Sequence, residues 1–234
     1  MARQPRVVVP GLAHYVLLRG LPGTRIFVDD TDREDFLRAL RGAVEGRAVQ
    51  VHAYALLDNE VHLLLRPEDE TGLARAVQTL GRRFVAGFNR RHGRSGTLWD
   101  GRYRTAIVEP GPHTLQAMTG IDARGGESPS SMTCSAAART GGRREAVLRD
   151  PPEYWALGNT PFDRELAYRA LLGQPLPAAA VQALAAAVRS GWVFGSTEFT
   201  RQMAQALQRP MQPRARGRPR RAGPAEASTG FTDS

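Results

Sequence analysis

The first part of the chain alternates between the hydrophobic patterns of strands and helices. Residues 14–19 form a short apolar run that ends at a Gly/Pro break, which is typical of a strand. Residues 29–44 begin with capping carboxylates and continue with apolar side chains at helical spacing, which predicts a helix. Residues 49–57 and 61–65 read as two apolar strands joined by the turn pair Asp58-Asn59.

Three further elements complete this part. Residues 71–89 form a long amphipathic pattern of helical period, residues 105–108 a short strand, and residues 114–123 another helix. The order strand–helix–strand–strand–helix–strand predicts the α+β class. We expect an antiparallel sheet with helices packed on one face.

The second part of the chain is less regular. A stretch rich in Gly, Ser, Pro and Arg predicts a loop, after which helices are expected at residues 163–172, 178–189 and 196–207. The last residues cannot build a core and predict a disordered tail. The predicted organisation is a DNA-binding domain, a linker, a helical appendage and a tail: residues 1–123, 124–152, 153–207 and 208–234.

Positive charge changes the picture most. The chain has 32 arginines and no lysine against 23 acidic residues, which gives a net charge of +9. Arginine offers a planar fork of donors that suits phosphates and guanine edges. The charge therefore favours nucleic acid as the partner. The alternative is a compositional habit of a GC-rich genome.

Neither a membrane segment nor a secretion signal is predicted. The sequence has no run of about 18 apolar residues, and its N-terminus lacks the apolar stretch of a secretory signal. The single cysteine, Cys134, cannot form an internal disulfide or a zinc site by itself. We therefore expect a cytoplasmic, nucleoid-associated protein, either monomeric or homodimeric.

The hairpin VHAYALLDNEVHLLL is a candidate metal site. Glu60 and His62 are two residues apart on one strand, so they share a face of the sheet, and His52 lies on the paired strand. A carboxylate beside an imidazole can bind a divalent cation such as Mg²⁺ or Mn²⁺. The alternative is that Glu60 lies at a turn edge and that His62 is a structural sheet histidine.

Residues 80–104 form a basic block in which aromatic side chains are interleaved with arginines. Guanidinium groups neutralise phosphates, and aromatic rings stack on unpaired bases. Helical spacing assigns Phe84 and Phe88 to the core, so Trp99 and Tyr103, in a Gly-punctuated loop, are the candidates for base contact. The alternative is a solvated basic helix end whose aromatic residues belong to the core. The predicted phosphate contacts are Arg82, Arg83, Arg90, Arg91, Arg94, Arg102 and Arg104.

Residues 214–221, RARGRPRR, resemble an AT-hook. A Gly-Arg-Pro core flanked by arginines is thin enough to enter a narrow A·T minor groove. The alternative is a generic basic tail with unspecific affinity for phosphates. Both interpretations predict DNA contact through Arg216, Arg218 and Arg220.

Together these segments resemble the REP-associated tyrosine transposases, single-tyrosine (HUH) enzymes related to insertion-sequence transposases. The family's hairpin reads roughly HAYVLMPNHVHLL, against HAYALLDNEVHLL at residues 52–64. Its next helix and loop read LGRRYVRYFNRRHGRSGTLWEGRFR, close to LGRRFVAGFNRRHGRSGTLWDGRYR at residues 80–104. Its C-terminal motifs, GWxxGSxxF and RGRPR, are similar to residues 191–199 and 216–220, so the resemblance covers about residues 3–221.

The resemblance implies a ferredoxin-like HUH domain that cleaves single-stranded DNA at a hairpin with the help of a metal ion. In the family, the two histidines of the H-x-H motif hold Mg²⁺ or Mn²⁺, which polarises the scissile phosphate. A tyrosine on a helix attacks this phosphate and leaves a 5′-phosphotyrosine link and a free 3′-OH.

The chain departs from the family pattern at the positions that carry this chemistry. The first metal histidine corresponds to Glu60, which is still an acceptable ligand for a hard metal. The family's helix segment CxRYIELNP corresponds to residues 117–125, which puts Gly120 at the position of the nucleophilic tyrosine. Arg124 replaces the asparagine that follows, and Asp122 keeps the acidic character. Glycine has no side chain, so it cannot attack a phosphate.

Three functions remain open on these residues. The first is a DNA-binding protein that recognises hairpin or repetitive DNA, single- or double-stranded, without cleaving it. The second is an active transposase that cleaves and joins single-stranded DNA through Glu60, His62 and a substitute nucleophile. The third is a degenerate relic without a selected function. The missing tyrosine favours the first function, and the candidate substitutes are Tyr103, Tyr154 and Thr119.

Overall fold

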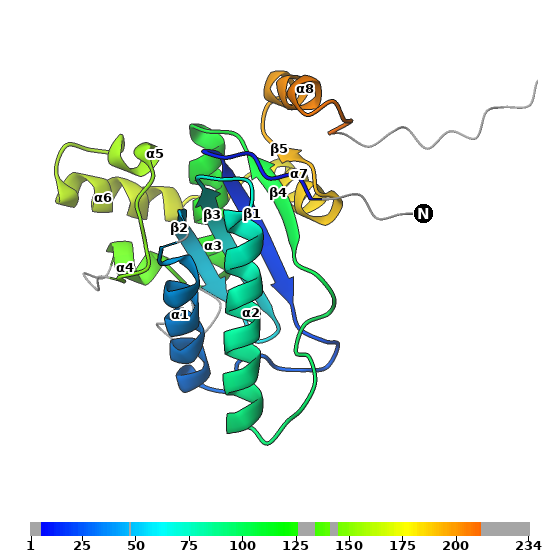
Figure 1. Cartoon of the computed structure of the whole chain (residues 1–234). Coiled ribbons are helices and arrows are strands. Elements are labelled where there is room, and N and C mark those ends of the chain that lie inside the picture. Colours follow the sequence, from blue (N-terminus) through cyan, green and yellow to red (C-terminus); the bar gives the residue numbers. More distant parts are fainter. Residues whose placement is uncertain (1–5, 47, 126–133, 141–144, 212–234) are drawn as a thin grey trace, which may run out of the picture.

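In the described part of the chain, five strands form one sheet at the centre of the molecule (Figure 1). The computed structural model describes residues 6–46, 48–125, 134–140 and 145–211. The strand order is β2-β3-β1-β4-β5. The strands are β1 (Ala13–Arg19), β2 (Val49–Leu56), β3 (Glu60–Pro67), β4 (Arg104–Val108) and β5 (Val193–Phe194). The antiparallel prediction is right for β1 to β4, while the short edge strand β5 runs parallel to β4.

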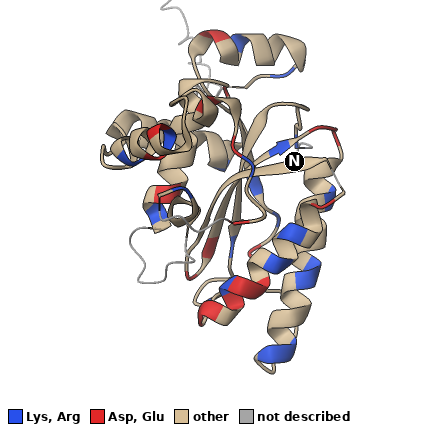
Figure 2. Ribbon diagram, turned by 90° about the vertical axis from the view of Figure 1, so that its left-hand side faces the viewer, with Lys and Arg blue, Asp and Glu red and all other residues tan. Residues whose placement is uncertain are grey.

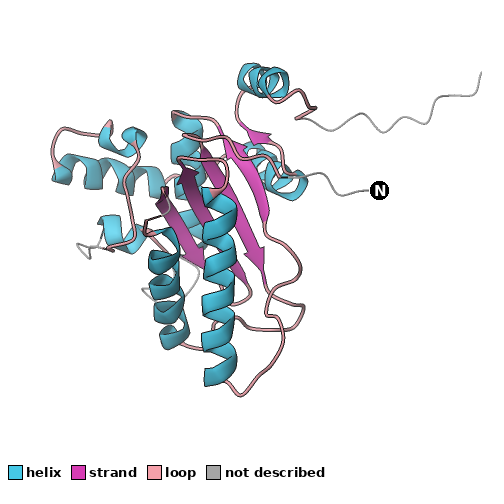
Figure 3. Cartoon of the chain, in the orientation of Figure 1, coloured by secondary structure: helices cyan, strands magenta, loops and turns pink. Residues whose placement is uncertain are grey.

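Helices cover both faces of this sheet (Figure 3). One face carries α1 (Asp30–Val44) and α2 (Gly72–Arg91). The other face carries α3 (Pro112–Gly125) and α7 (Ala178–Ser190). The remaining helices of the described residues are α4 (Ala136–Thr140), α5 (Pro152–Trp155), α6 (Pro161–Leu172) and α8 (Thr197–Ala206).

The predicted α+β class is confirmed, but the expectation that helices lie on one face needs correction. The central strand β1 is apolar on both sides, because successive side chains of a strand point to opposite faces. Val16 and Leu18 pack into the core under α1 and α2. Tyr15 and Leu17 pack into a second core under α3 and α7. A strand that is buried on both faces requires a helical layer on each.

Local sequence explains how α1 and α2 form. The side chain of Asp29 accepts a hydrogen bond from the Asp32 amide and caps α1. The two helices run antiparallel, because the last turn of α2 contacts the first turn of α1 through Arg91 and Asp29. Apolar side chains three or four residues apart make one buried stripe along α2: Leu73, Val77, Leu80, Phe84 and Phe88.

The prediction of a loop over residues 124–152 is wrong for much of its described part. Helix α3 continues to Gly125, α4 forms, and Cys134 makes a bridge to β2. The guanidinium of Arg139 is buried and lies 3.7 Å from Asp122 and 3.2 Å from Asp150. A composition rich in Gly, Ser and Arg gives no sign of such buried ion pairs, because they depend on tertiary contacts.

The predicted helices of the second part are confirmed as α6, α7 and α8. The fully buried Tyr168 of α6 donates a hydrogen bond to Asp122 Oδ2 at 2.6 Å. Helix α7 ends at Gly191, whose φ of 73° is left-handed, and the chain then enters the sheet as β5. Within the described ranges, every helix is too short or too polar to span a membrane.

Candidate nucleic-acid interface

The arginines of α2 lie on more than one side of the helix, and basic segments recur along it in Figure 2. Arg75 and Arg82 are two turns apart, so they share a face, and both line a groove beside α2. Arg83 is one residue further on and about 100° around the helix. Its guanidinium lies against α1, where a Cβ added to Gly42 would be 2.5 Å from Arg83 Nη1. The structure therefore separates two predicted phosphate contacts that are adjacent in sequence.

The groove has a volume of about 780 Å³ and lies between α2 and the loop that leads to β4. Its apolar lining includes Leu18, Val77 and Val85. None of its lining residues in the described part of the chain is acidic. We call it the Trp99 groove, and the arginines and large aromatic residues that line it are Arg6, Arg75, Arg82, Arg102, Trp99 and Tyr103.

Trp99 is half-buried and lies between this groove and the core. Its ring centroid is 6.1 Å from that of Phe84, with the ring planes inclined by 36°. The indole lies close to α2 at Gly81, where an added Cβ would be 3.5 Å from Nε1. Its buried Nε1 has no hydrogen-bond acceptor among the described residues. Packing against Phe84 and Gly81 therefore orients Trp99, whose contact with a base stays a prediction.

Tyr103 is also half-buried, and an arginine from the N-terminal segment covers part of it. The guanidinium carbon of Arg6 lies 4.0 Å from the centroid of the Tyr103 ring. Arg6 Nη2 donates to the Tyr103 carbonyl oxygen at 2.6 Å. Burial raises the pKa of Tyr103. Arg6 therefore joins the groove, although it lies 97 positions before Tyr103.

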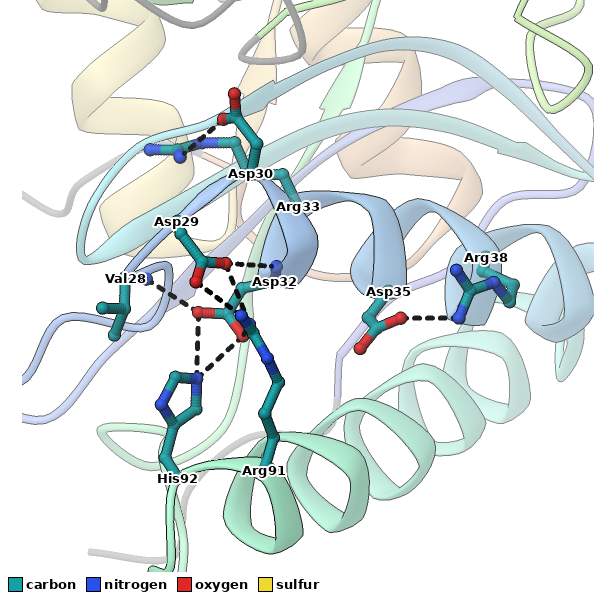
Figure 4. A network of polar contacts seen from close by, with 9 residues as sticks. All are labelled: Val28, Asp29, Asp30, Asp32, Arg33, Asp35, Arg38, Arg91 and His92. Atoms are coloured by element: carbon teal, nitrogen blue, oxygen red, sulfur yellow. Dashed lines mark hydrogen bonds and ion pairs between the residues drawn. The ribbon is translucent and has the colours of Figure 1, made fainter.

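Arg91 has carboxylate partners within the protein (Figure 4). Its guanidinium lies 2.5 Å from Asp29 Oδ2 and forms a second, short ion pair with Asp32. His92 Nε2 lies 2.9 Å from the same Asp32 carboxylate. The hydrogen bond from Arg91 lowers the pKa of Asp29 to about 2. Arg91 stays a predicted phosphate contact, but its charge is compensated by two carboxylates at the start of α1.

The other predicted arginines are exposed but do not line the Trp99 groove. Arg90 and Arg94 lie at and just after the end of α2. Arg104 pairs with Leu17 in the sheet, so it shares the face of Leu17 and not that of the groove. The arginines of the predicted AT-hook, Arg216, Arg218 and Arg220, lie outside the described residues.

Glu60 and His62 lie side by side on β3, as their spacing predicts. His62 Nε2 is 3.2 Å from Glu60 Oε2. Arg19 contacts the other carboxylate oxygen, with its Nη2 2.7 Å from Glu60 Oε1. The His62 imidazole and the Arg19 guanidinium lower the pKa of Glu60 to about 2, while burial lowers the pKa of His62. The hydroxyl of Tyr15 shares a hydrogen bond of 2.8 Å with His62 Nδ1.

These residues do not fit a divalent cation. Among the described residues, no three or more His, Cys, Asp or Glu side chains form a group that could hold a metal ion. Arg19 already binds Glu60, and Arg124 brings a further positive charge near His62. His52 has a different partner, because its Nδ1 donates to the Arg149 carbonyl at 2.7 Å. The arrangement favours the alternative interpretation, in which His62 is a structural sheet histidine.

Residues of the α7 region lie against position 120, where the resemblance implies a nucleophile. A Cβ added to Gly120 would be 3.0 Å from Leu176 Cδ1 and 3.7 Å from Leu184 Cδ2. A contact of 3.0 Å is tighter than ordinary van der Waals packing, so Leu176 must move before any side chain fits. In this structure the half-buried Leu176 side chain therefore occupies the space beside Gly120.

The candidate substitutes for the nucleophile lie in three different surroundings. Thr119 is buried, and its hydroxyl donates to the Leu115 carbonyl at 3.0 Å. Tyr154 is buried beside Tyr168. Tyr103 lines the Trp99 groove and not the surroundings of His62. The tyrosine that contacts His62 is Tyr15, which the sequence analysis did not single out, because a strand residue in an apolar run reads as core.

Comparisons with solved structures give partial likenesses, among them two transposases. A REP-associated tyrosine transposase bound to a REP hairpin matches 53% of this chain and 72% of its own, at 13% identity and a TM-score of 0.45. A candidate transposase from Deinococcus radiodurans R1 matches 53% of this chain and 97% of its own, at 18% identity and a TM-score of 0.36. No protein-family profile and no curated protein matches the chain.

Proposed function

We propose that this protein binds DNA through the Trp99 groove and does not cleave it. The observation that carries the proposal is the convergence of two aromatic rings and four arginines on one groove without acidic lining residues in the described part of the chain. Arginines neutralise backbone phosphates, and aromatic rings stack on unpaired bases. Such a groove suits a single-stranded segment, such as the loop or flank of a hairpin.

The sequence supports the same class of ligand. Residues 80–104 contribute Arg82, Trp99, Arg102 and Tyr103 to the groove, and this is the segment that resembles the REP-associated tyrosine transposases. The solved transposase of that name is bound to a REP hairpin. A DNA hairpin with a single-stranded flank is therefore the first probe to use.

The proposed lack of cleavage rests on the other face of the sheet. A glycine at position 120 offers no nucleophile, and Leu176 lies against it. The Glu60 carboxylate, which corresponds to a metal ligand of the family, is bound by Arg19. Among the described residues, these two observations argue against both the metal and the attacking tyrosine of the family's chemistry.

The test is one binding reaction analysed on two gels. Full-length protein is incubated with a labelled hairpin carrying a single-stranded flank, in the presence of Mn²⁺, beside an oligonucleotide of equal composition without the palindrome. We expect a retarded band on a native gel and intact DNA on a denaturing gel. If neither the hairpin nor the control oligonucleotide gives a retarded band, the proposed binding is overturned.

A covalent adduct or a discrete cut on the denaturing gel would overturn the proposed lack of cleavage and establish an active transposase. Tyr15→Phe and Tyr103→Phe would then identify the nucleophile. Each substitution removes one hydroxyl and keeps the ring that packs in the structure, so an effect on the adduct alone reports on chemistry.

A further inference from the structure

A second pocket of about 520 Å³ lies on the face of the sheet opposite the Trp99 groove. The two sites share the end of β1, because Leu18 lines the groove and Leu17 lines the pocket. Residues of β1, β3, α3 and α7 border it. We call it the Arg124 pocket, and it has no part in the DNA contact proposed above.

Three arginines from three different elements line this pocket. Arg19 comes from β1, Arg124 from α3 and Arg189 from α7. Glu60 is the one carboxylate among its described lining residues, and Arg19 binds it. In the part of the chain that the structure describes, neither Arg124 nor Arg189 has an ion pair with a carboxylate. Positive charge therefore exceeds negative charge around the pocket.

A tyrosine hydroxyl adds a neutral polar group to this lining. Tyr15 makes a hydrogen bond of 2.8 Å to His62 Nδ1, and burial raises its pKa to about 12 although the positive charge of Arg124 counteracts this rise. Arg124 is half-buried on α3, while Arg189 is exposed on α7. The pocket lining therefore combines one half-buried and one exposed arginine.

We propose that the Arg124 pocket binds a phosphate group without a metal ion, with Arg124 and Arg189 as its main donors. The planar fork of a guanidinium matches two phosphate oxygens at once, and these charge-assisted hydrogen bonds are strong. The arginines supply the positive charge that a divalent cation would otherwise bring, which explains why the pair Glu60 and His62 does not need to hold one. The phosphate is either the terminal phosphate of a nucleic acid or free phosphate.

Calorimetric titration of the full-length protein tests this proposal. The probes are inorganic phosphate, the dinucleotide pTpT and the unphosphorylated dinucleotide TpT, all in the presence of EDTA. The dinucleotides are too short to span from the pocket to the Trp99 groove on the other face, so failure here is distinct from failure of the DNA-binding proposal. We expect pTpT or phosphate to bind and TpT to bind at least about tenfold more weakly.

Variants assign the binding to the pocket. Arg124→Gln and Arg189→Gln should each weaken the phosphate probe by about tenfold, because each removes charge-assisted hydrogen bonds. Arg83→Gln, against α1, is the matched control and should leave it unchanged. Because Arg189 is exposed, Arg189→Gln should not destabilise the fold. It therefore tests the pocket even if Arg124→Gln lowers the melting temperature of the protein.

The outcomes separate cleanly. Tighter binding of pTpT than of inorganic phosphate supports the proposal with a nucleic-acid end as ligand, and equal binding supports it with free phosphate. Binding that occurs only when Mn²⁺ replaces EDTA in the titration would overturn it in favour of a metal site. Failure of both phosphate probes to bind, or binding that Arg189→Gln and Arg124→Gln leave unchanged, would also overturn it.

Discussion

Arg82 and Arg83 are neighbours in the chain, yet they lie against different parts of the molecule. Arg82 lines the Trp99 groove, and Arg83 lies against Gly42 of α1. The same divergence separates Leu17 from Leu18 on β1, because a strand alternates its faces at every residue. At the scale of single residues, the geometry of the element decides which site each side chain serves.

This separation predicts different effects on DNA binding. Arg82→Ala should weaken hairpin binding several-fold and reduce the slope of log Kd against log salt concentration by about one, since one phosphate contact is lost. Arg83→Ala should leave both quantities nearly unchanged. Fluorescence anisotropy of a labelled hairpin at several salt concentrations measures both. Equal losses for the two variants would contradict the assignment of the groove as the binding surface.

Helices α1 and α2 are joined by a polar cluster as well as by their apolar stripes (Figure 4). The buried Asp32 carboxylate is its centre: it accepts a hydrogen bond from the Val28 amide at 2.8 Å and contacts Arg91 and His92. The carboxylates at the start of α1 and the cations at the end of α2 each interact favourably with the dipole of their own helix. The cluster therefore fixes the antiparallel pairing of the two helices.

Replacement of Asp32 tests this role. Asp32→Ala should lower the free energy of unfolding by about 2–3 kcal/mol, because it leaves buried polar partners without their acceptor. The control is Asp35→Ala on the same helix, which removes a surface ion pair with Arg38 and should cost less than about 1 kcal/mol. Urea denaturation followed by circular dichroism compares the two variants. A loss at Asp35 as large as that at Asp32 would contradict the central role of the cluster.

The elements were predictable wherever a local pattern decides them. The apolar stripe over residues 71–89 becomes α2, and the pair Asp58-Asn59 becomes the turn between β2 and β3. The groove was predictable in part, since Arg75 lies two helical turns before Arg82. The position of Arg6 on Tyr103 and the packing of α7 on the sheet were not predictable, because they depend on contacts between residues far apart in the sequence.

On the scale of the whole molecule, a sheet covered on both faces also buries its histidines. His14, His52 and His62 are almost fully inaccessible, and burial lowers the pKa of each. The fold holds His14 in its neutral form: Nδ1–H donates to the Leu12 carbonyl at 2.9 Å, and Nε2 accepts from the Val9 amide at 3.2 Å. Protonation of Nε2 would abolish the second bond.

The stability of the protein should therefore decrease in mild acid. The pKa of His14 is about 4 in the folded state against 6.5 as its ordinary value, so the unfolded state binds the proton first as the pH falls. The free energy of unfolding should drop between pH 6.5 and 4, at up to about 1.4 kcal/mol per pH unit for each such histidine. Urea melts across this range measure the slope, which His14→Asn should reduce. An unaltered slope in that variant would exclude His14 as a contributor.

The packing around Gly120 bears on which side chains this position accepts. A Cβ there would lie 3.0 Å from Leu176 Cδ1, so the side chain of Leu176 would have to shift. Overpacking of this kind costs about 1–3 kcal/mol unless the neighbours change as well. Larger side chains at position 120 should therefore be accepted more easily together with a smaller residue at position 176.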